Sequence, residues 1–159
     1  MVASLRMRTG DDLRRISREL NRMDNQEVKK RFRKELRAVA QPFVPLVRNS
    51  IKSIPSKRSY SAEGLRGRMV KATRIEVRTV GRDAGVAIRV DGRKMPAKMK
   101  ALPKGMEGTK RWRHPVFGNR EVWVSQAPHP YFFKVVRPAA VGGRRAAARV
   151  VDSITRDIS

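Results

Sequence analysis

Apolar residues recur every three or four positions over a long stretch in the first half of the chain. This spacing predicts one amphipathic helix over residues 26–54, because it places the apolar side chains on a single face. Pro42 and Pro45 fall inside the pattern, and an interior proline removes a backbone hydrogen bond and clashes with the preceding turn. We therefore expect a kink near Ala40. The apolar positions are Val28, Phe32, Leu36, Val39, Phe43, Leu46 or Val47, Ile51 and Ile54.

Helical patterns also occupy both ends of the chain. Residues 1–25 predict an N-terminal helical segment, in which Asp11 and Asp12 suit the positive end of the helix dipole and residues 21–25 form a break. A C-terminal helix is predicted from apolar positions that share one face, and Gly142 and Gly143 are expected to separate it from the preceding segment. Those positions are Ala147, Val150, Val151, Ile154 and Ile158.

Alternation of apolar and polar residues predicts strands in two places. Residues 73–91 hold two alternating runs around a glycine-containing turn, which predicts a hairpin with one buried and one charged face. Residues 120–126 alternate in the same way, and Pro128 ends that run because proline cannot donate to a ladder. Between them, residues 92–110 are rich in lysine, glycine and proline, and we expect a flexible basic loop without a packed element.

This order of elements predicts an α+β fold. We expect a small antiparallel sheet of three or four strands, packed with a long N-terminal helix and a C-terminal helix. At 159 residues the chain fits a single domain over residues 1–159, with residues 111–159 forming a strand, an aromatic turn and the last helix. A sheet of this size has open edges that neighbouring subunits can pair with or cover.

Large rigid side chains are concentrated in residues 110–133. This segment holds both tryptophans, both histidines and six of the nine aromatic residues of the chain. Such side chains fix either a corner of the core or a partner surface. The order within the segment is a turn with Gly118 and Asn119, a strand carrying Trp123, and a proline-bounded aromatic run.

The order of these motifs resembles the head–tail joining or tail-completion proteins of long-tailed bacteriophages. The residues that carry the resemblance are His114 to Asn119, Trp123, Val124, Gln126 and Pro130 to Phe132, with weaker support from Gly64, Leu65 and Arg66. The resemblance implies a structural virion protein of the phage neck, whose copies form a ring at the head–tail interface around the DNA channel. The ring is expected to be a hexamer that matches the tail.

The resemblance also implies partners and a location. The protein would contact tail terminator and head-completion or connector proteins, and genomic DNA would pass nonspecifically through the lumen. It would lie in the virion neck, at the top of the tail, and in the host cytoplasm during assembly. The side chains expected at the core corner or subunit interface are Trp112, His114, Phe117, Trp123, Gln126, Tyr131 and Phe132. Those expected to face the DNA channel or acidic partners are Lys94, Lys98, Lys100, Lys104, Lys110, Arg111 and Arg113.

The charge of the chain supports a second hypothesis. A formal net charge of +24 is spread over the whole length, so the chain attracts polyanions wherever it presents its surface. Trp112 stands between Arg111 and Arg113, as in a base-stacking platform with flanking phosphate contacts. The alternative function is therefore a basic, nonspecific nucleic-acid-binding module of the ribosomal or nucleoid type.

Catalysis and cofactor binding find little support in the residues. The chain has no cysteine, and its two histidines, His114 and His129, show no metal-ligand spacing with carboxylates. No glycine-rich phosphate loop and no nucleophile elbow is present. We therefore expect neither enzymatic activity nor a cofactor or metal. No apolar run is long enough to span a bilayer, so no membrane partner is expected.

Overall fold

The computed structural model describes residues 4–7, 10–22, 25–55, 64–79, 85–116 and 119–158. In chain order the elements are β1 (Ser4–Met7), α1 (Gly10–Arg22), α2 (Gln26–Ala40), α3 (Phe43–Lys52), α4 (Gly64–Ala72), β2 (Thr73–Arg78), β3 (Gly85–Val90), the 3₁₀ helices η1 (Gly92–Lys94) and η2 (Ala97–Met99), α5 (Leu102–Glu107), β4 (Trp112–Val116), β5 (Asn119–Gln126) and α6 (Phe133–Ile158). Helices and antiparallel strands together confirm the predicted α+β class.

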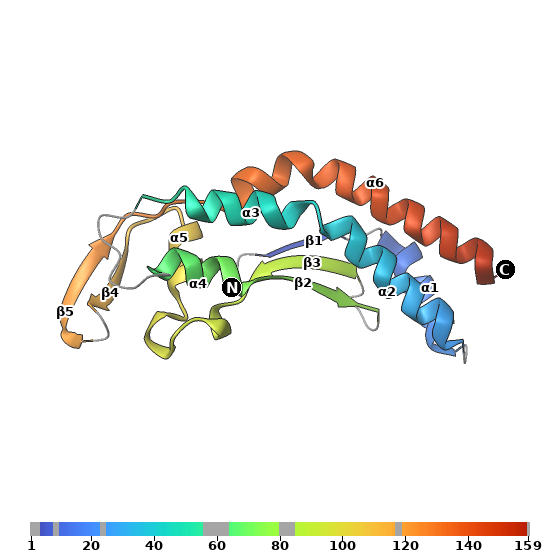
Figure 1. Cartoon of the computed structure of the whole chain (residues 1–159), viewed down its shortest axis with the longest axis horizontal. Helices are drawn as coiled ribbons and strands as arrows, with labels where there is room; N and C mark the ends of the chain where they lie inside the picture. The colour runs from blue at the N-terminus through green and yellow to red at the C-terminus, as the bar shows by residue number, and fades with distance from the viewer. Residues whose placement is uncertain are drawn as a thin grey trace.

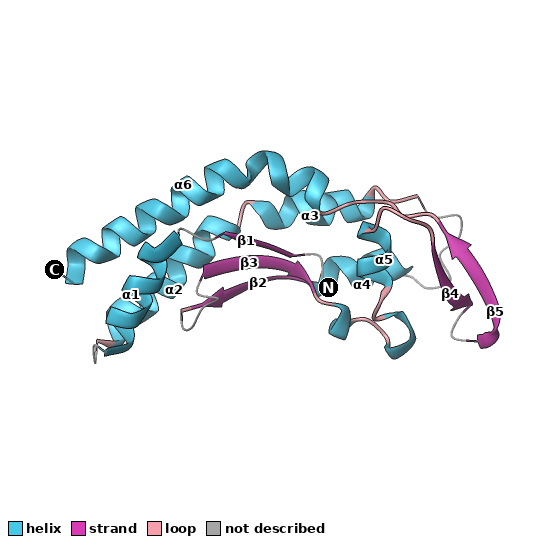
Figure 2. Cartoon of the chain, turned by 180° about the vertical axis from the view of Figure 1, so that it is seen from behind, coloured by secondary structure: helices cyan, strands magenta, loops and turns pink. Residues whose placement is uncertain are grey.

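The molecule is an elongated arch with two different ends. Helices α2, α3 and α6 form a layer over one face of a three-stranded sheet, and α6 ends the chain at one extremity (Figure 1). The β4–β5 hairpin lies at the opposite extremity, beyond α4 and α5 (Figure 2). The hairpin therefore stands apart from the layer of long helices.

The strands form two antiparallel sheets and not the single sheet predicted. The order in the larger sheet is β1-β3-β2, and β4 pairs only with β5 in the smaller one. The β2–β3 hairpin confirms the alternation seen in residues 73–91. Strand β1 was not predicted, because four residues give too short a pattern and the strand depends on a partner more than 80 residues away, with Leu5 opposite Ile88.

The first helices follow the predicted pattern with one difference. Helix α1 ends at Arg22 and α2 begins at Gln26, which confirms the predicted break. The side chain of Asn25 caps α2, since its Oδ1 accepts a hydrogen bond from the backbone N–H of Val28 at 3.1 Å. The predicted kink near Ala40 is a full break, because α2 stops there and α3 starts at Phe43, after Pro42.

Helix α6 corrects the prediction of a separation at Gly142 and Gly143. It runs through both glycines and through Pro138 without interruption for 26 residues. A glycine costs roughly 1 kcal/mol relative to alanine inside a helix, so burial must offset that cost. One face of α6 is buried along the length of the helix and provides this compensation. Its residues are Val136, Ala140, Gly143, Ala147, Val151 and Ile154.

Residues 92–110 are not the loop without packed elements that their composition suggests. They form η1, η2 and α5, and Met95, Leu102 and Met106 belong to the hydrophobic core. The lysines of this segment remain exposed. The core continues from here under the helical layer, and its largest fully buried side chains include Tyr131, Phe32, Phe132, Ile16 and Leu36.

Candidate functional site

The β4–β5 hairpin presents consecutive large apolar side chains to solvent in the middle of β5. Val122, Trp123 and Val124 on β5 are 49%, 47% and 39% exposed, and we call these three residues the hairpin patch. Consecutive strand residues point to opposite faces, so the hairpin is apolar on both faces. Trp123, expected at a core corner or a subunit interface, is half exposed and does not belong to the core of the described residues.

The polar group of Trp123 is nevertheless satisfied within the hairpin. Its indole Nε1–H donates a hydrogen bond to the carbonyl oxygen of Arg120 at 2.7 Å. The guanidinium of Arg113 on β4 stands 5.9 Å from the centre of the indole ring, within cation–π range. What remains exposed on Trp123 is therefore apolar surface without an unpaired donor.

The base of the hairpin is fixed to α5 by stacking. The indole of Trp112 lies against Gly105 so closely that a Cβ at Gly105 would overlap it. The imidazole of His114, two residues further along β4, is tilted by 33° against this indole, with the ring centres 4.6 Å apart. Gly105 is therefore required for the close approach of β4 to α5.

A short polar chain extends this attachment from β4 to α5. His114 Nε2 and Gln126 Oε1 are 2.8 Å apart, and the amide nitrogen of Gln126 donates to the sulfur of Met106 at 3.3 Å. The backbone N–H of His129 donates to the carbonyl oxygen of Met106 at 2.9 Å. Three of the side chains expected to act together, Trp112, His114 and Gln126, thus meet at the hairpin base.

Glu107 joins the same region to the start of α6. One carboxylate oxygen accepts hydrogen bonds from the backbone N–H groups of Tyr131 and Phe132 at 2.9 and 2.8 Å. The other accepts from the N–H of Phe133, the first residue of α6, at 3.0 Å. A carboxylate at a helix N-terminus satisfies donors that have no partner within the helix and complements the helix dipole.

Tyr131 and Phe132 are fully buried below this carboxylate, as expected for a core corner. The hydroxyl of Tyr131 donates to the carbonyl oxygen of Pro103 at 3.2 Å. Burial raises the pKa of Tyr131, and the negative charge of Glu107 adds to the effect. The rings of Phe132 and Phe133 meet edge to face at 5.3 Å. Phe117 lies outside the described residues.

The basic residues expected at a channel or acidic partner are exposed but do not form one cluster with the aromatic side chains. Lys94, Lys98, Lys100, Lys104 and Lys110 are all exposed. Arg111 is held on the hairpin, where its guanidinium donates to the side chain and carbonyl oxygen of Ser125 at 3.1 and 2.8 Å. Arg113 is the one that contacts an aromatic ring of the hairpin patch.

Sequence reasoning missed the residues on the α5 side of this site. Met95, Met99, Leu102 and Met106 follow each other in steps of four, three and four, which is helical spacing. Pro103 lies in the first turn of α5, where a proline is well tolerated. These signals were present, but the glycines and prolines around them favoured a loop.

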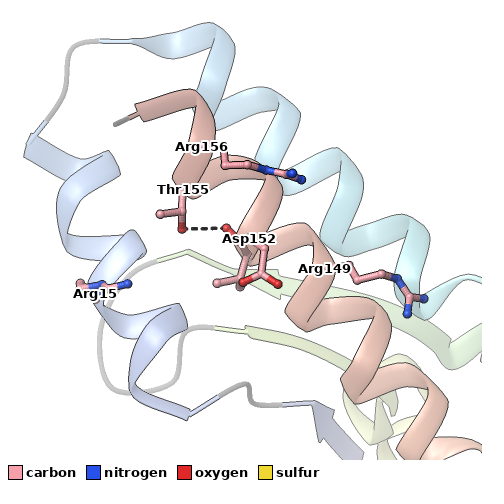
Figure 3. A pocket seen from close by; sticks show the side chains of 6 residues that line it. Arg15, Arg149, Asp152, Thr155 and Arg156 are labelled. Carbon is pink, nitrogen blue, oxygen red and sulfur yellow. Dashed lines mark hydrogen bonds between the residues drawn. The ribbon is translucent and has the colours of Figure 1, made fainter.

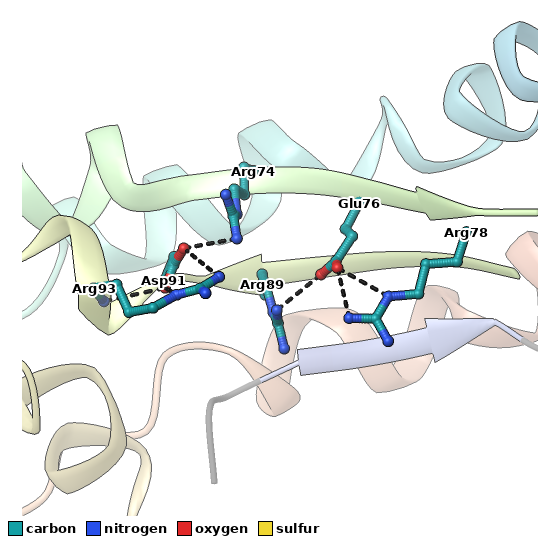
Figure 4. Close-up of polar contacts among 6 residues, drawn as sticks. All are labelled: Arg74, Glu76, Arg78, Arg89, Asp91 and Arg93. Atoms are coloured by element: carbon teal, nitrogen blue, oxygen red, sulfur yellow. Dashed lines mark hydrogen bonds and ion pairs between the residues drawn. The ribbon is translucent and has the colours of Figure 1, made fainter. Parts of the chain in front are cut away.

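The outward face of the larger sheet carries a network of arginines and carboxylates (Figure 4). Arg74 and Arg89 are directly opposite each other on β2 and β3, an arrangement of like charges that destabilises a sheet unless it is compensated. Asp91 binds Arg74 at 2.7 Å, and Glu76 binds Arg89 at 2.8 Å. Arg78 and Arg93 complete the network on Glu76 and Asp91.

The two carboxylates of this network are held in the charged form. A hydrogen bond from Arg78 outweighs the effect of burial and lowers the pKa of Glu76 below its ordinary value of 4.5, with Arg89 adding to the shift. Burial raises the pKa of Asp91, but hydrogen bonds from Arg93 and the charge of Arg74 outweigh it. The pKa of Asp91 therefore lies below its ordinary value of 3.8.

We expect this network to make stability depend on pH in the acid range. Because both folded pKa values are lowered, the stabilisation is complete above the ordinary values and is lost as pH falls through the folded ones. A Glu76→Gln, Asp91→Asn double variant should be less stable than the parent near neutral pH, and the difference should shrink below about pH 4. Urea unfolding at a series of pH values measures this difference. A difference in the free energy of unfolding that stays constant into the acid range would contradict the stabilising role of these two carboxylates.

A second basic surface is a groove between α1 and α6 (Figure 3). Arg15 from α1 and Arg149 and Arg156 from α6 line it, together with Asp152 and Thr155. Three arginines and one aspartate line this groove, and arginine suits bidentate contact with phosphate. The groove is a candidate contact for a polyanion.

Other kinds of site find no support in the part of the chain that the structure describes. Within that part, no three histidines, cysteines or carboxylates come together as a metal site. None of the helices in the described ranges combines the length and apolar character needed to cross a bilayer. Comparison with models of protein families, with curated proteins and with solved structures finds no match to this chain.

Proposed function

We propose that this protein is a structural component of a bacteriophage neck, whose copies form a ring that joins or completes the tail at the head–tail interface. The observation that carries the proposal is the hairpin patch at one end of an elongated molecule. A two-stranded hairpin is only marginally stable alone in water, and large apolar side chains on both of its faces favour a partner. A surface of this kind is suited to contact between subunits.

The geometry favours a head-to-tail contact. The hairpin lies at the extremity opposite the end of α6, so it is directed away from the helical layer of its own subunit (Figure 2). When different surfaces of identical subunits meet, the assembly closes into a ring if the rotation permits it. The resemblance to neck proteins implies six copies, which would match the tail.

The residues behind the resemblance have a shared structural role, which supports the proposal. His114 and Gln126 bond to each other at the hairpin base, and Tyr131 and Phe132 lie under Glu107 where the hairpin joins α6. Trp123 and Val124 belong to the hairpin patch. The motif thus describes a projecting arm and its attachment.

The proposal includes partners beyond the ring itself. Tail terminator and head-completion or connector proteins would contact its two rims, and genomic DNA would pass through its lumen. The exposed lysines of residues 94–110 are candidates for contact with that DNA or with acidic neighbours. The protein would act in the virion neck after assembly in the host cytoplasm, without enzymatic activity.

A substitution in the hairpin patch tests the proposal. We expect Trp123→Ala to prevent ring formation, because an aromatic anchor at an interface often contributes most of the binding energy. The same change should alter the free energy of unfolding of the monomer by only about 1 kcal/mol or less, because the indole is half exposed. Leu65→Ala, on the exposed surface of α4, is a matched control that should leave assembly intact.

Mass measurement and negative-stain imaging at moderate salt provide the readout. Rings from the parent chain and from Leu65→Ala, but not from Trp123→Ala, are the expected result. If the parent chain remains monomeric even with tail tubes present, or if Trp123→Ala forms rings as readily as the parent, the proposal fails.

The groove in Figure 3 favours a second candidate function, a nonspecific nucleic-acid-binding module. Its three arginines and the net charge of +24 are the features that phosphate backbones bind. This function requires a monomer or dimer whose affinity for DNA or RNA falls steeply with salt, with a slope set by the number of phosphates contacted. Tight, salt-dependent RNA binding by a protein that forms no ring would favour it over the neck.

A further inference from the structure

An apolar groove opens on the helical layer, at a distance from the hairpin. Val39, Phe43 and Leu46 line it from α2 and α3, and Ala139, Gly142 and Ala146 line it from α6. We call it the helix groove. Its volume of about 270 Å³ is below the usual range of small-molecule sites, so its size suits one or two side chains of a protein partner.

The helix groove exists because the facing helices leave room there. Helices α2 and α3 are interrupted at Pro42, and α6 carries small residues opposite the interruption. A Cβ added at Gly142 would have nothing within 4 Å. The space is therefore open to a side chain from outside.

Exposed apolar residues mark both the hairpin and the helix groove. Among the described residues, six large hydrophobic side chains are exposed, and three of them form the hairpin patch. A fourth, Leu46, lines the helix groove. Strand β5, which carries the patch, lies at one extremity of the arch, whereas α2, α3 and α6, which line the groove, form the helical layer (Figure 1). The patch and the groove are therefore separate surfaces of one subunit.

Charge restricts what can approach this protein closely. Two copies that each carry +24 repel each other over most of their surfaces. The described residues that line the helix groove include no charged side chain. Its lining residues therefore add no charge of their own to the repulsion that a second copy meets there.

We propose that the hairpin patch of one copy lies in the helix groove of the next. This inference rests on the proposed function, because it names the two surfaces that meet in the ring. Trp123 can be buried there without leaving a polar atom unsatisfied, since its indole N–H is already bonded to the carbonyl oxygen of Arg120. Val122 and Val124 would then face away from the groove, because they lie on the other face of the hairpin.

Engineered cysteines test this contact directly. The chain has no cysteine of its own, so Glu121→Cys, on the same face of β5 as Trp123, and Gly142→Cys introduce single thiols at the two surfaces. After mild oxidation of a mixture of the two single variants, we expect a disulfide-linked heterodimer. Leu65→Cys, mixed with Glu121→Cys, is the control pair and should give much less of this product.

The outcomes separate this inference from the proposed function. If the variants form rings but the Glu121–Gly142 pair links no better than the control pair, the helix groove is not the receptor and the neck proposal stands. If no oligomer forms and no link appears, both fail.

Filling the helix groove provides a second test that does not depend on thiol chemistry. Gly142→Phe should fold, because the space around position 142 is open, and it should weaken self-association by at least about tenfold. Gly142→Ala occupies little of the groove and should associate as the parent does. Self-association that is unchanged in Gly142→Phe, with only tail binding lost, would assign the groove to another protein and overturn the inference.

Discussion

Replacing Glu107 with alanine is expected to lower the free energy of unfolding by about 3 kcal/mol, because three backbone N–H groups lose a charged acceptor. Each hydrogen bond to a charged group contributes roughly 1.5–3 kcal/mol, and the three share one partly exposed carboxylate, so they do not add fully. The lost hydrogen bonds lie at the junction between α5, the hairpin base and the start of α6.

Glu107→Gln and Glu121→Ala are the controls for this prediction. Glutamine keeps one acceptor oxygen, so it should retain part of the stability. Glu121 is exposed on β5, and its removal should change the free energy of unfolding by no more than about 0.5 kcal/mol. Urea unfolding gives all three values. An effect of Glu107→Ala no larger than that of Glu121→Ala would show that the junction does not depend on this carboxylate.

Phe132→Ala is expected to have the largest effect on stability, at about 4 kcal/mol. The ring is fully buried and meets both Tyr131 and Phe133 edge to face. Truncation removes the apolar surface and leaves a cavity that the surrounding residues fill only in part. Phe132→Leu keeps much of the volume and should cost only about 1 kcal/mol.

Thermal or urea unfolding measures these losses, with Trp123→Ala as the internal comparison. Both residues belong to the aromatic segment, but Trp123 is half exposed, so its loss should affect assembly and not folding. A buried Trp123 would have cost roughly 3 kcal/mol or more. Equal losses of stability in Phe132→Ala and Trp123→Ala would contradict this division of roles.

Elements with a local signal could be predicted from the sequence. The β2–β3 hairpin and the break before α2 follow from alternation and from capping by Asn25, which act over a few residues. The continuity of α6 could not be predicted, because Gly142 and Gly143 disfavour a helix by themselves. Packing against α2 and α3 overrides that preference.

The sequence identified side chains of the candidate site, but it did not indicate which of them contact each other. The alternation of β5 gave two faces, yet it could not indicate that both face solvent at Val122 and Trp123. The role of Glu107 could not be read from a sequence motif, because its hydrogen-bond partners are backbone N–H groups 24 to 26 residues further along the chain. Side-chain patterns contain no information about such contacts.

The pairing of β1 with β3 sets an order of events during synthesis of the chain. Strand β1 leaves the ribosome first, but its partner residues 86–89 follow 79 to 85 residues later. The β2–β3 hairpin closes a short loop and can form as soon as both strands exist, whereas β1 must close a much longer one. We therefore expect β1 to join the sheet last. Until it does, β3 offers an open edge to other newly made chains.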